Sequence, residues 1–164
     1  MRKIFLTTLL VIMMSAATAL AASWTQIYTD DNDDEIFFDT DSVSISSMTE
    51  NRDEVTFSAQ FRMNYSEKGR QALINWYRDY SIMPQDIQSL AYDVTTINFR
   101  KIGDKRVYYI SERKSYTASG RLLEDMHFVN TNPTWEEVPV ASVVDVEYFN
   151  AFLIVDGKKF EPNY

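Results

Sequence analysis

Polar and apolar residues alternate over residues 54–65, and this alternation is the clearest pattern in the chain. The polar positions include Thr56, Ser58 and Gln60. The apolar positions are Val55, Phe57, Ala59, Phe61, Met63 and Tyr65. Successive side chains of a strand point to opposite faces, so the alternation predicts a strand with one apolar and one wet face. Such strands are typical of an antiparallel sheet with one buried face.

The spacing of apolar residues changes to a helical period after Ser66, a residue type that favours the N-cap of a helix. Pro84 prevents a helix from continuing further. The apolar residues at this spacing are Ala72, Leu73, Trp76, Tyr77 and Tyr80. We therefore expect an amphipathic helix over about 67–80, with these residues as its apolar stripe.

Three later segments, 89–101, 105–116 and 121–129, are rich in β-branched and aromatic residues. Gly103-Asp104 and Ala118-Ser119-Gly120 separate them, and both sequences favour hairpin turns. This arrangement predicts a three-stranded antiparallel meander.

Residues 140–155 are ambiguous. Their valines and aromatic residues favour a strand by propensity, whereas Pro139 and Ser142 resemble the start of a helix. We favour a helix and leave the strand open. After it, Asp156-Gly157 predicts a turn, with Phe160 packing a short tail back onto the body. The expected fold is α+β: an antiparallel sheet, a meander of about five or six strands, with two helices packed on it.

The first residues have the pattern of an export signal. Two basic residues precede the uncharged apolar run Ile4–Met14, and small residues follow it through Ala22. We expect residues 1–22 to be removed as a signal peptide and residues 23–164 to form a single domain in the periplasm or at the cell surface. The apolar run is shorter than the roughly 20 residues that span a bilayer, so no membrane insertion is expected after cleavage.

Composition narrows the classes of partner. The chain has no cysteine, so neither disulfides nor a lipid anchor are expected, and its 45% hydrophobic content must supply the core. It carries 24 acidic and 16 basic residues, a formal net charge of -8. An acidic chain disfavours nucleic acids and anionic membranes as partners.

Basic residues nevertheless gather between positions 100 and 121. They are Arg100, Lys101, Lys105, Arg106, Arg113, Lys114 and Arg121. All of these basic residues except Arg121, together with Tyr109, form a candidate binding surface for a protein or a glycan, which would be held by charge and aromatic stacking. Because Tyr108 and Tyr109 are adjacent on a predicted strand, one of the two should face the core. The alternative is that these cations are solvated outer positions of strands.

Three stretches together resemble the surface-adhesin protein E-like family of small exported bacterial proteins. They are Trp24 with Ile27 and Ile36–Val43, Tyr116 with Gly120–Leu123, and Trp135 with Val138, Pro139, Ser142 and Val143. The resemblance implies an α+β fold and, for the named adhesin, self-association and binding to host extracellular proteins. This chain departs from the family in lacking the cysteines of several relatives and in its extra helix at 67–80.

No catalytic constellation stands out. His127 is the single histidine and has no cysteine or second histidine with which to build a zinc site. The segment Asp30–Asp41 has side-chain oxygens at the spacing of a calcium-binding loop, from Asp30, Asn32, Asp34 and Asp41. However, Glu35 occupies the position that requires glycine in such a loop. We therefore expect an acidic turn and no cofactor.

Two functional hypotheses follow. The first is a non-enzymatic, adhesin-like exported protein that binds a macromolecule, with homodimerisation left open. The second is an envelope protein that binds a small ligand or metal, or is a hydrolase, through the carboxylates of the segment Asp30–Asp41. A deep pocket with converging carboxylates would favour the second hypothesis.

Overall fold

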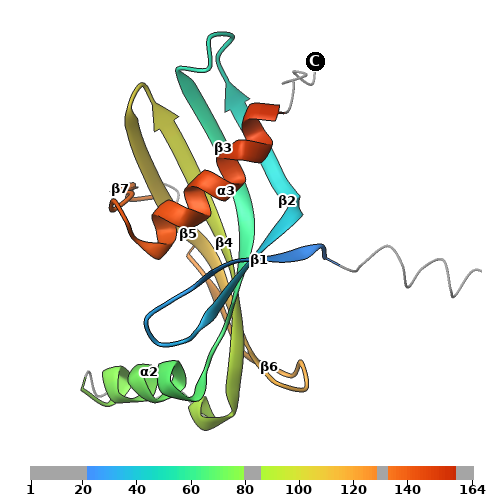
Figure 1. The fold of residues 1–164 in the computed structure, drawn as a ribbon, viewed down its shortest axis with the longest axis vertical. Coiled ribbons are helices and arrows are strands. Elements are labelled where there is room, and N and C mark those ends of the chain that lie inside the picture. Colours follow the sequence, from blue (N-terminus) through green and yellow to red (C-terminus); the bar gives the residue numbers. More distant parts are fainter. Residues whose placement is uncertain (1–21, 80–85, 129–132, 158–164) are drawn as a thin grey trace, which may run out of the picture.

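A single antiparallel sheet forms the body of the protein (Figure 1). The computed structural model describes residues 22–79, 86–128 and 133–157. Its strands are β1 (Trp24–Thr29), β2 (Glu35–Met48), β3 (Glu54–Asn64), β4 (Leu90–Ile102), β5 (Lys105–Thr117), β6 (Leu122–His127) and β7 (Glu136–Glu137). The first six pair in sequence order, and β7 pairs with β5. The α+β prediction is confirmed, but the described sheet has seven strands instead of five or six.

The predicted turns of the meander form as expected. Gly103 and Gly120 have φ angles of 56° and 80°, which glycine adopts without the steric cost of a Cβ. The three predicted strands 89–101, 105–116 and 121–129 correspond to β4, β5 and β6, although residue 129 lies outside the described residues. The alternating segment 54–65 forms β3 and buries Val55, Phe57, Ala59 and Phe61.

Helix α3 (Val143–Gly157) lies across one half of the sheet and contacts β1, β2 and β3. It covers an aromatic core in which the rings of Phe57 and Phe99 lie 5.3 Å apart and the rings of Phe99 and Tyr148 lie 5.7 Å apart. The helix favoured for residues 140–155 is therefore confirmed. The predicted turn at Asp156-Gly157 is wrong, because the helix continues through both residues.

Helix α2 (Glu67–Asp79) lies at the other end of the sheet, on the same face, and confirms the predicted helix up to Asp79. Its buried face differs from the predicted stripe: Ile74 and Tyr77 are buried, whereas Trp76 is 51% exposed. Ile74 and Tyr77 pack with Leu90 and with Ile87 of the short 3-10 helix η2 (Ile87–Ser89). The amphipathic pattern located the helix, but contact with the sheet decided which side is buried.

Three predictions lie wholly or mostly outside the described residues: the signal peptide over residues 1–22, the helix end at Tyr80 and Pro84, and the packing of the tail at Phe160. None of the helices in the described part of the chain combines the length and the apolar content needed to cross a bilayer.

Candidate functional site

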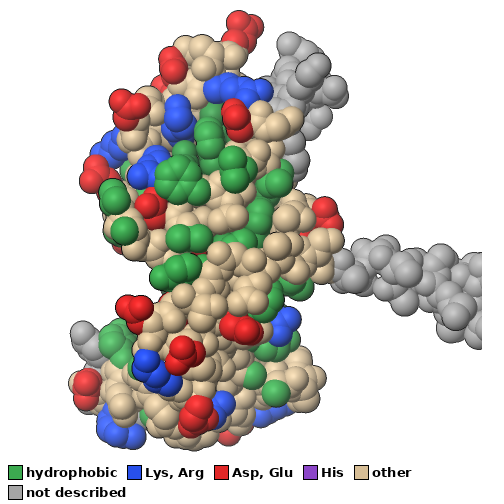
Figure 2. All heavy atoms as spheres, in the orientation of Figure 1, with side chains coloured by type: hydrophobic (Ala, Val, Ile, Leu, Met, Phe, Trp, Pro, Cys, Tyr) green, Lys and Arg blue, Asp and Glu red, His purple; other side chains and the backbone are tan. Residues whose placement is uncertain are grey.

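A groove of about 500 Å³ lies on the helix-covered face of the sheet, between α2 and α3. Figure 2 shows the molecule narrowing between the part that carries α3 and the part that carries α2, with hydrophobic side chains exposed at this level. The apolar lining includes Phe61, Met63, Leu73, Trp76, Ile97 and Ile110. The charged lining consists of Asp30, Asp34, Asp93, Arg113 and Glu147. The groove therefore brings together residues from three central strands, two helices and the turn between β1 and β2.

The turn between β1 and β2 fixes the start of α2. Ser66 is the N-cap that the sequence predicted, since its Oγ accepts a hydrogen bond from the Gly69 backbone N–H at 2.9 Å. The Asp34 carboxylate accepts a hydrogen bond from the Ser66 backbone N–H at 2.7 Å. A Cβ at position 69 would overlap this carboxylate, so glycine is required there. Burial raises the pKa of Asp34, and its hydrogen bonds with Ser66 oppose that rise.

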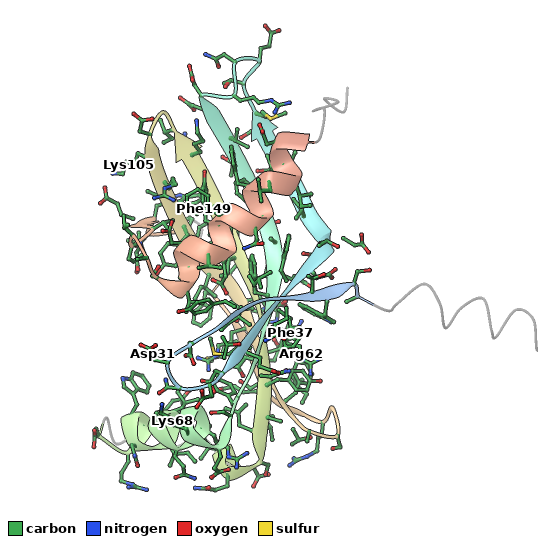
Figure 3. All side chains as sticks on the ribbon, viewed as in Figure 1. Asp31, Phe37, Arg62, Lys68, Lys105 and Phe149 are labelled. Atoms are coloured by element: carbon green, nitrogen blue, oxygen red, sulfur yellow. The ribbon has the colours of Figure 1, made fainter. Side chains whose placement is uncertain are left out.

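A second contact joins the same turn to α2, where Lys68 donates a hydrogen bond to the backbone carbonyl of Asp31. Figure 3 shows Asp31 in the turn and Lys68 on the helix below it. The acidic turn is therefore built into the attachment of α2.

Asp93 on β4 forms the buried polar centre of the groove and is 2% exposed. Its Oδ2 accepts hydrogen bonds from the Tyr65 hydroxyl at 2.8 Å and from Arg113 Nε at 2.6 Å. Its Oδ1 is buried and has no hydrogen-bond partner among the described residues. Burial alone would lower the pKa of Arg113, but Asp93 and Tyr65 outweigh this effect and raise it. Arg113 therefore stays charged, and its guanidinium forms an ion pair with Asp93.

Glu147 is the other buried acid of the groove. It lies on α3 and is 7% exposed. Among the described residues, no hydrogen-bond or ion-pair partner reaches its carboxyl group. Burial raises the pKa of Glu147 to about 8, so the group is mainly uncharged at neutral pH. A carboxyl group with these properties, on the wall of a groove, is a candidate ligand contact.

The candidate calcium ligands are only partly brought together. Asp30 Oδ1 accepts hydrogen bonds from the backbone N–H groups of Asn32 and Asp34, at 2.8 and 2.9 Å. These three residues line the groove, but Asp41 does not. Asp41 lies six residues beyond the start of β2, roughly 20 Å along a strand. The segment therefore forms an acidic turn closed by the hydrogen bonds of Asp30, and the four candidate calcium ligands do not converge.

The basic residues between positions 100 and 121 are engaged within the chain. Their ion-pair partners are Glu54 for Arg100, Glu137 for Lys105, Asp145 for Arg106, Asp93 for Arg113, Glu112 for Lys114 and Asp86 for Arg121. Lys101 Nζ donates a hydrogen bond to the Arg52 carbonyl at 3.2 Å. Neighbouring residues such as Arg113 and Lys114 also project from opposite faces of the sheet. The structure does not bring these cations together into one free surface.

Arg106 and Tyr109, two of the candidate binding residues, have structural contacts. Arg106 pairs with Asp145 of α3 at 2.6 Å, and its guanidinium lies 5.3 Å from the centre of the Tyr148 ring. Tyr109 is half-buried against Trp135, with ring centres 4.7 Å apart. Tyr108 packs against the main core, as expected for one of two adjacent tyrosines. Arg106 therefore anchors α3.

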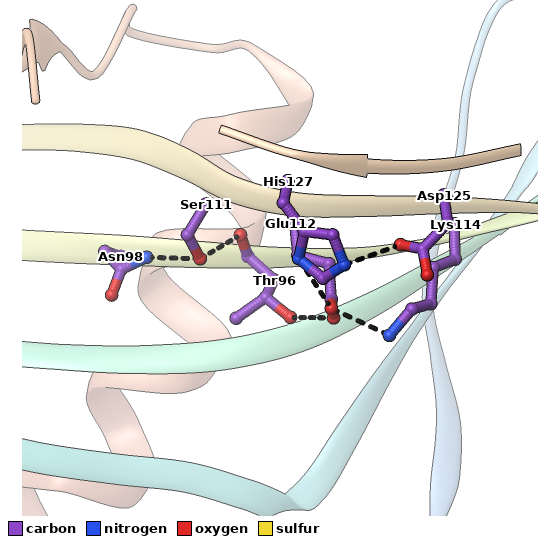
Figure 4. Close-up of polar contacts among 7 residues, drawn as sticks. All are labelled: Thr96, Asn98, Ser111, Glu112, Lys114, Asp125 and His127. Carbon is purple, nitrogen blue, oxygen red and sulfur yellow. Dashed lines mark hydrogen bonds and ion pairs between the residues drawn. The ribbon is translucent and has the colours of Figure 1, made fainter. Parts of the chain in front are cut away.

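His127 has carboxylate neighbours that the sequence did not indicate. Glu112 of β5 lies opposite it, and Asp125 precedes it by two residues on the same face of β6, as Figure 4 shows. Donor atoms of these three residues lie within 4.8 Å of one another, a set that could hold a transition metal. However, Lys114 Nζ already lies 2.7 Å from Glu112 Oε1 and lowers the pKa of that carboxyl group. In this structure the three residues form contacts around the Glu112–Lys114 ion pair at the surface of the sheet.

The outer side of α3 exposes apolar side chains. Phe149, labelled in Figure 3, is 52% exposed, and Leu153 is 70% exposed. Residues four apart lie on one helix face, so the two side chains are neighbours. Homodimerisation was left open by the sequence and stays a hypothesis.

Sequence reasoning missed Asp93, Glu147 and Gly69 as site residues. Asp93 occupies a core-facing position of β4, and Glu147 is a buried acid in the mainly apolar helix α3. A charged residue at a position whose neighbours are buried is a signal that pattern analysis could have used. Nothing in the sequence indicated that both residues meet in one groove.

Comparisons of the chain with protein-family models, with curated proteins and with solved structures found no match. The resemblance to the surface-adhesin protein E-like family therefore stays a prediction.

Proposed function

We propose that the protein is an exported binding protein that holds a ligand with an apolar body in the groove between α2 and α3. The observation that carries this proposal is the groove itself, about 500 Å³ in volume, in which apolar side chains and four carboxyl groups meet. Ligand sites are typically clefts of about 300–1,000 Å³ with mainly apolar walls and a few polar groups. The converging carboxylates favour the second functional hypothesis. The groove includes Asp30 and Asp34 of the predicted segment, together with Asp93 and Glu147, but not Asp41.

Binding is proposed in preference to catalysis because three of the four carboxyl groups of the groove, those of Asp30, Asp34 and Asp93, are held by hydrogen bonds within the protein. The lining that the structure describes contains no serine, cysteine or histidine. Export rests on the pattern of residues 1–22, which lie outside the described residues.

The hypothesis of a macromolecular partner at the basic segment has less support. Each of the seven basic residues has an intramolecular contact, and exposed ion pairs or hydrogen bonds would have to be exchanged for contacts with a partner. The groove needs no such exchange to admit a ligand.

The test uses N-phenyl-1-naphthylamine, an uncharged apolar probe whose fluorescence rises in apolar surroundings. We expect saturable binding to the mature protein. Ala72 lines the groove on α2, and its neighbour Gln71 is exposed without lining it. Ala72→Phe should therefore weaken binding at least about tenfold, and Gln71→Phe should leave it unchanged. Absence of saturable binding, or an equal effect of the two substitutions, would overturn the proposal.

A further inference from the structure

We propose that the ligand of the groove carries a cationic group, an ammonium or guanidinium on an apolar body, and that this cation binds the Glu147 carboxyl group. The inference rests on the proposed function and specifies its ligand class. It commits to a cationic amphiphile as the occupant of the groove.

The balance of charge in the groove supports a cation. Four carboxyl groups, those of Asp30, Asp34, Asp93 and Glu147, line it against the single guanidinium of Arg113. That guanidinium is bound by Asp93 Oδ2. An anionic ligand would therefore meet like charges and no available cation among the described lining residues.

The position of Glu147 supplies an independent observation. Glu147 lines the groove and is 7% exposed, so its carboxyl group is largely removed from water, which costs free energy unless a partner compensates. Asp34 is held by Ser66, and Asp93 Oδ2 is held by Arg113 and Tyr65 while its Oδ1 is buried without a partner among the described residues. Two carboxyl groups on the groove wall therefore have hydrogen-bonding capacity left for a ligand. A ligand cation would supply the missing partner, because a charge-assisted hydrogen bond is stronger in buried surroundings.

The titration of Glu147 agrees with this role. Burial raises its pKa to about 8, and a bound cation would lower it again, so binding near pH 7 should release a proton. The other titratable or charged groups of the groove are Asp30 and Asp34 in the β1–β2 turn, Tyr65 after β3, Asp93 on β4 and Arg113 on β5. Tyr108 on β5 is also close enough to Glu147 for the acid to contribute to its raised pKa, after burial and Glu136. None of these groups is a free cation that would neutralise Glu147.

The experiment compares three probes with one apolar chain: octylammonium, 1-octanol and octanoate, each displacing N-phenyl-1-naphthylamine from the mature protein. A primary amine ionises with a pKa of about 10.4, so octylammonium keeps its charge between pH 6 and pH 9. We expect octylammonium to displace the dye at a concentration at least about tenfold lower than 1-octanol, and octanoate to be the weakest. The preference should grow as the pH rises from 6 to 9, because Glu147 ionises over this interval.

Glu147→Gln should abolish the preference for octylammonium while the dye and 1-octanol still bind. Asp41→Asn is the control, since it makes the same change from a carboxyl group to an amide outside the groove and should preserve the preference. Calorimetry in buffers of different ionisation enthalpy should show proton release on octylammonium binding that is absent in Glu147→Gln. A thermal melt of each variant confirms that it is folded.

The outcomes separate the two proposals. If neither the dye nor any octyl probe binds, the proposed function fails. If the dye binds but 1-octanol competes as well as octylammonium, or binding weakens above pH 8, the groove binds an uncharged ligand that accepts a hydrogen bond from protonated Glu147. The cationic ligand class would then be wrong, and the proposed function would stand.

Discussion

The two helices lie on the same face of the same sheet but are attached to it by different interactions. Helix α3 buries Tyr148, Ala151 and Val155 in a core that includes the aromatic residues of β3 and β4. Helix α2 contributes two side chains, Ile74 and Tyr77, to a much smaller cluster. Its first turn is held by polar contacts with Asp34 and Ser66. One helix is held mainly by apolar burial and the other mainly by hydrogen bonds.

This difference explains where the groove lies. The two apolar clusters do not merge, and the groove occupies the face of the sheet between them. Its charged groups belong to the turn that holds α2, to strands β4 and β5, and to the end of α3 nearest the groove. The part of the sheet under α3 supplies stability, whereas the interval between the helices supplies the concave, chemically mixed surface that a ligand requires.

The largest effect should come from the core under α3. Phe99 is completely buried and contacts Phe57, Phe61 and Tyr148. Phe99→Ala should lower the free energy of unfolding by about 3–5 kcal/mol, measured by urea denaturation. Ile74→Ala under α2 should cost less, about 2 kcal/mol, because the surrounding cluster is small. Equal losses would mean that α2 is as much a part of the core as α3.

The second effect concerns the end of α3 that borders the groove. Because the folded-state pKa of Glu147 is about 8 and its ordinary value is 4.5, the folded protein retains a proton that the unfolded chain releases. The contribution of Glu147 to stability should therefore fall as the pH rises from about 4.5 to about 8, by at most about 1.4 kcal/mol per pH unit, and then level off. Glu147→Gln should remove this slope in urea titrations at several pH values. An unchanged slope would show that Glu147 is not buried as an unpartnered acid.

The third effect tests the polar attachment near α2. Arg113→Met removes the cation that neutralises Asp93 and should cost about 3 kcal/mol, the low end for a buried pair, because the Arg113 side chain is 25% exposed. Adding Asp93→Asn should recover part of the loss, since no uncompensated charge then remains buried. The free energy of unfolding of the two single variants and the double variant gives the coupling. Additive losses would show that the two residues do not act as a pair.

The smallest effect comes from one methyl group at the start of α2. Gly69→Ala should displace the Asp34 carboxylate and cost about 1–3 kcal/mol, because the added Cβ has no space. Gly157→Ala at the end of α3 is the matched control: its Cβ would meet nothing within 4 Å, so the substitution should be neutral or slightly stabilising. Thermal denaturation of both variants checks the comparison, and a neutral Gly69→Ala would argue against the contact between Asp34 and α2.

The sequence by itself determined much of the local structure. Alternation predicted β3, glycine-containing turns predicted the meander of β4, β5 and β6, and Ser66 and Ser142 predicted the starts of α2 and α3. These features depend on interactions within a few residues, such as side-chain periodicity, capping hydrogen bonds and positive φ angles at glycine. They can therefore be derived without knowing what the segment contacts.

Only the tertiary structure decided the site. The basic residues between positions 100 and 121 look like one surface in the sequence, but neighbouring ones project from opposite faces of the sheet. Most of them pair with acids far away along the chain, such as Arg100 with Glu54 and Arg106 with Asp145. Asp34, Asp93 and Glu147 belong to three separate segments, and they meet because the turn between β1 and β2 and both helices border the same face of the sheet. The side of α2 that is buried was decided in the same way, by Leu90 and Ile87 against Ile74 and Tyr77. Long-range packing sets these positions, and packing depends on which faces meet in space, a property that the spacing of residues along the chain does not contain.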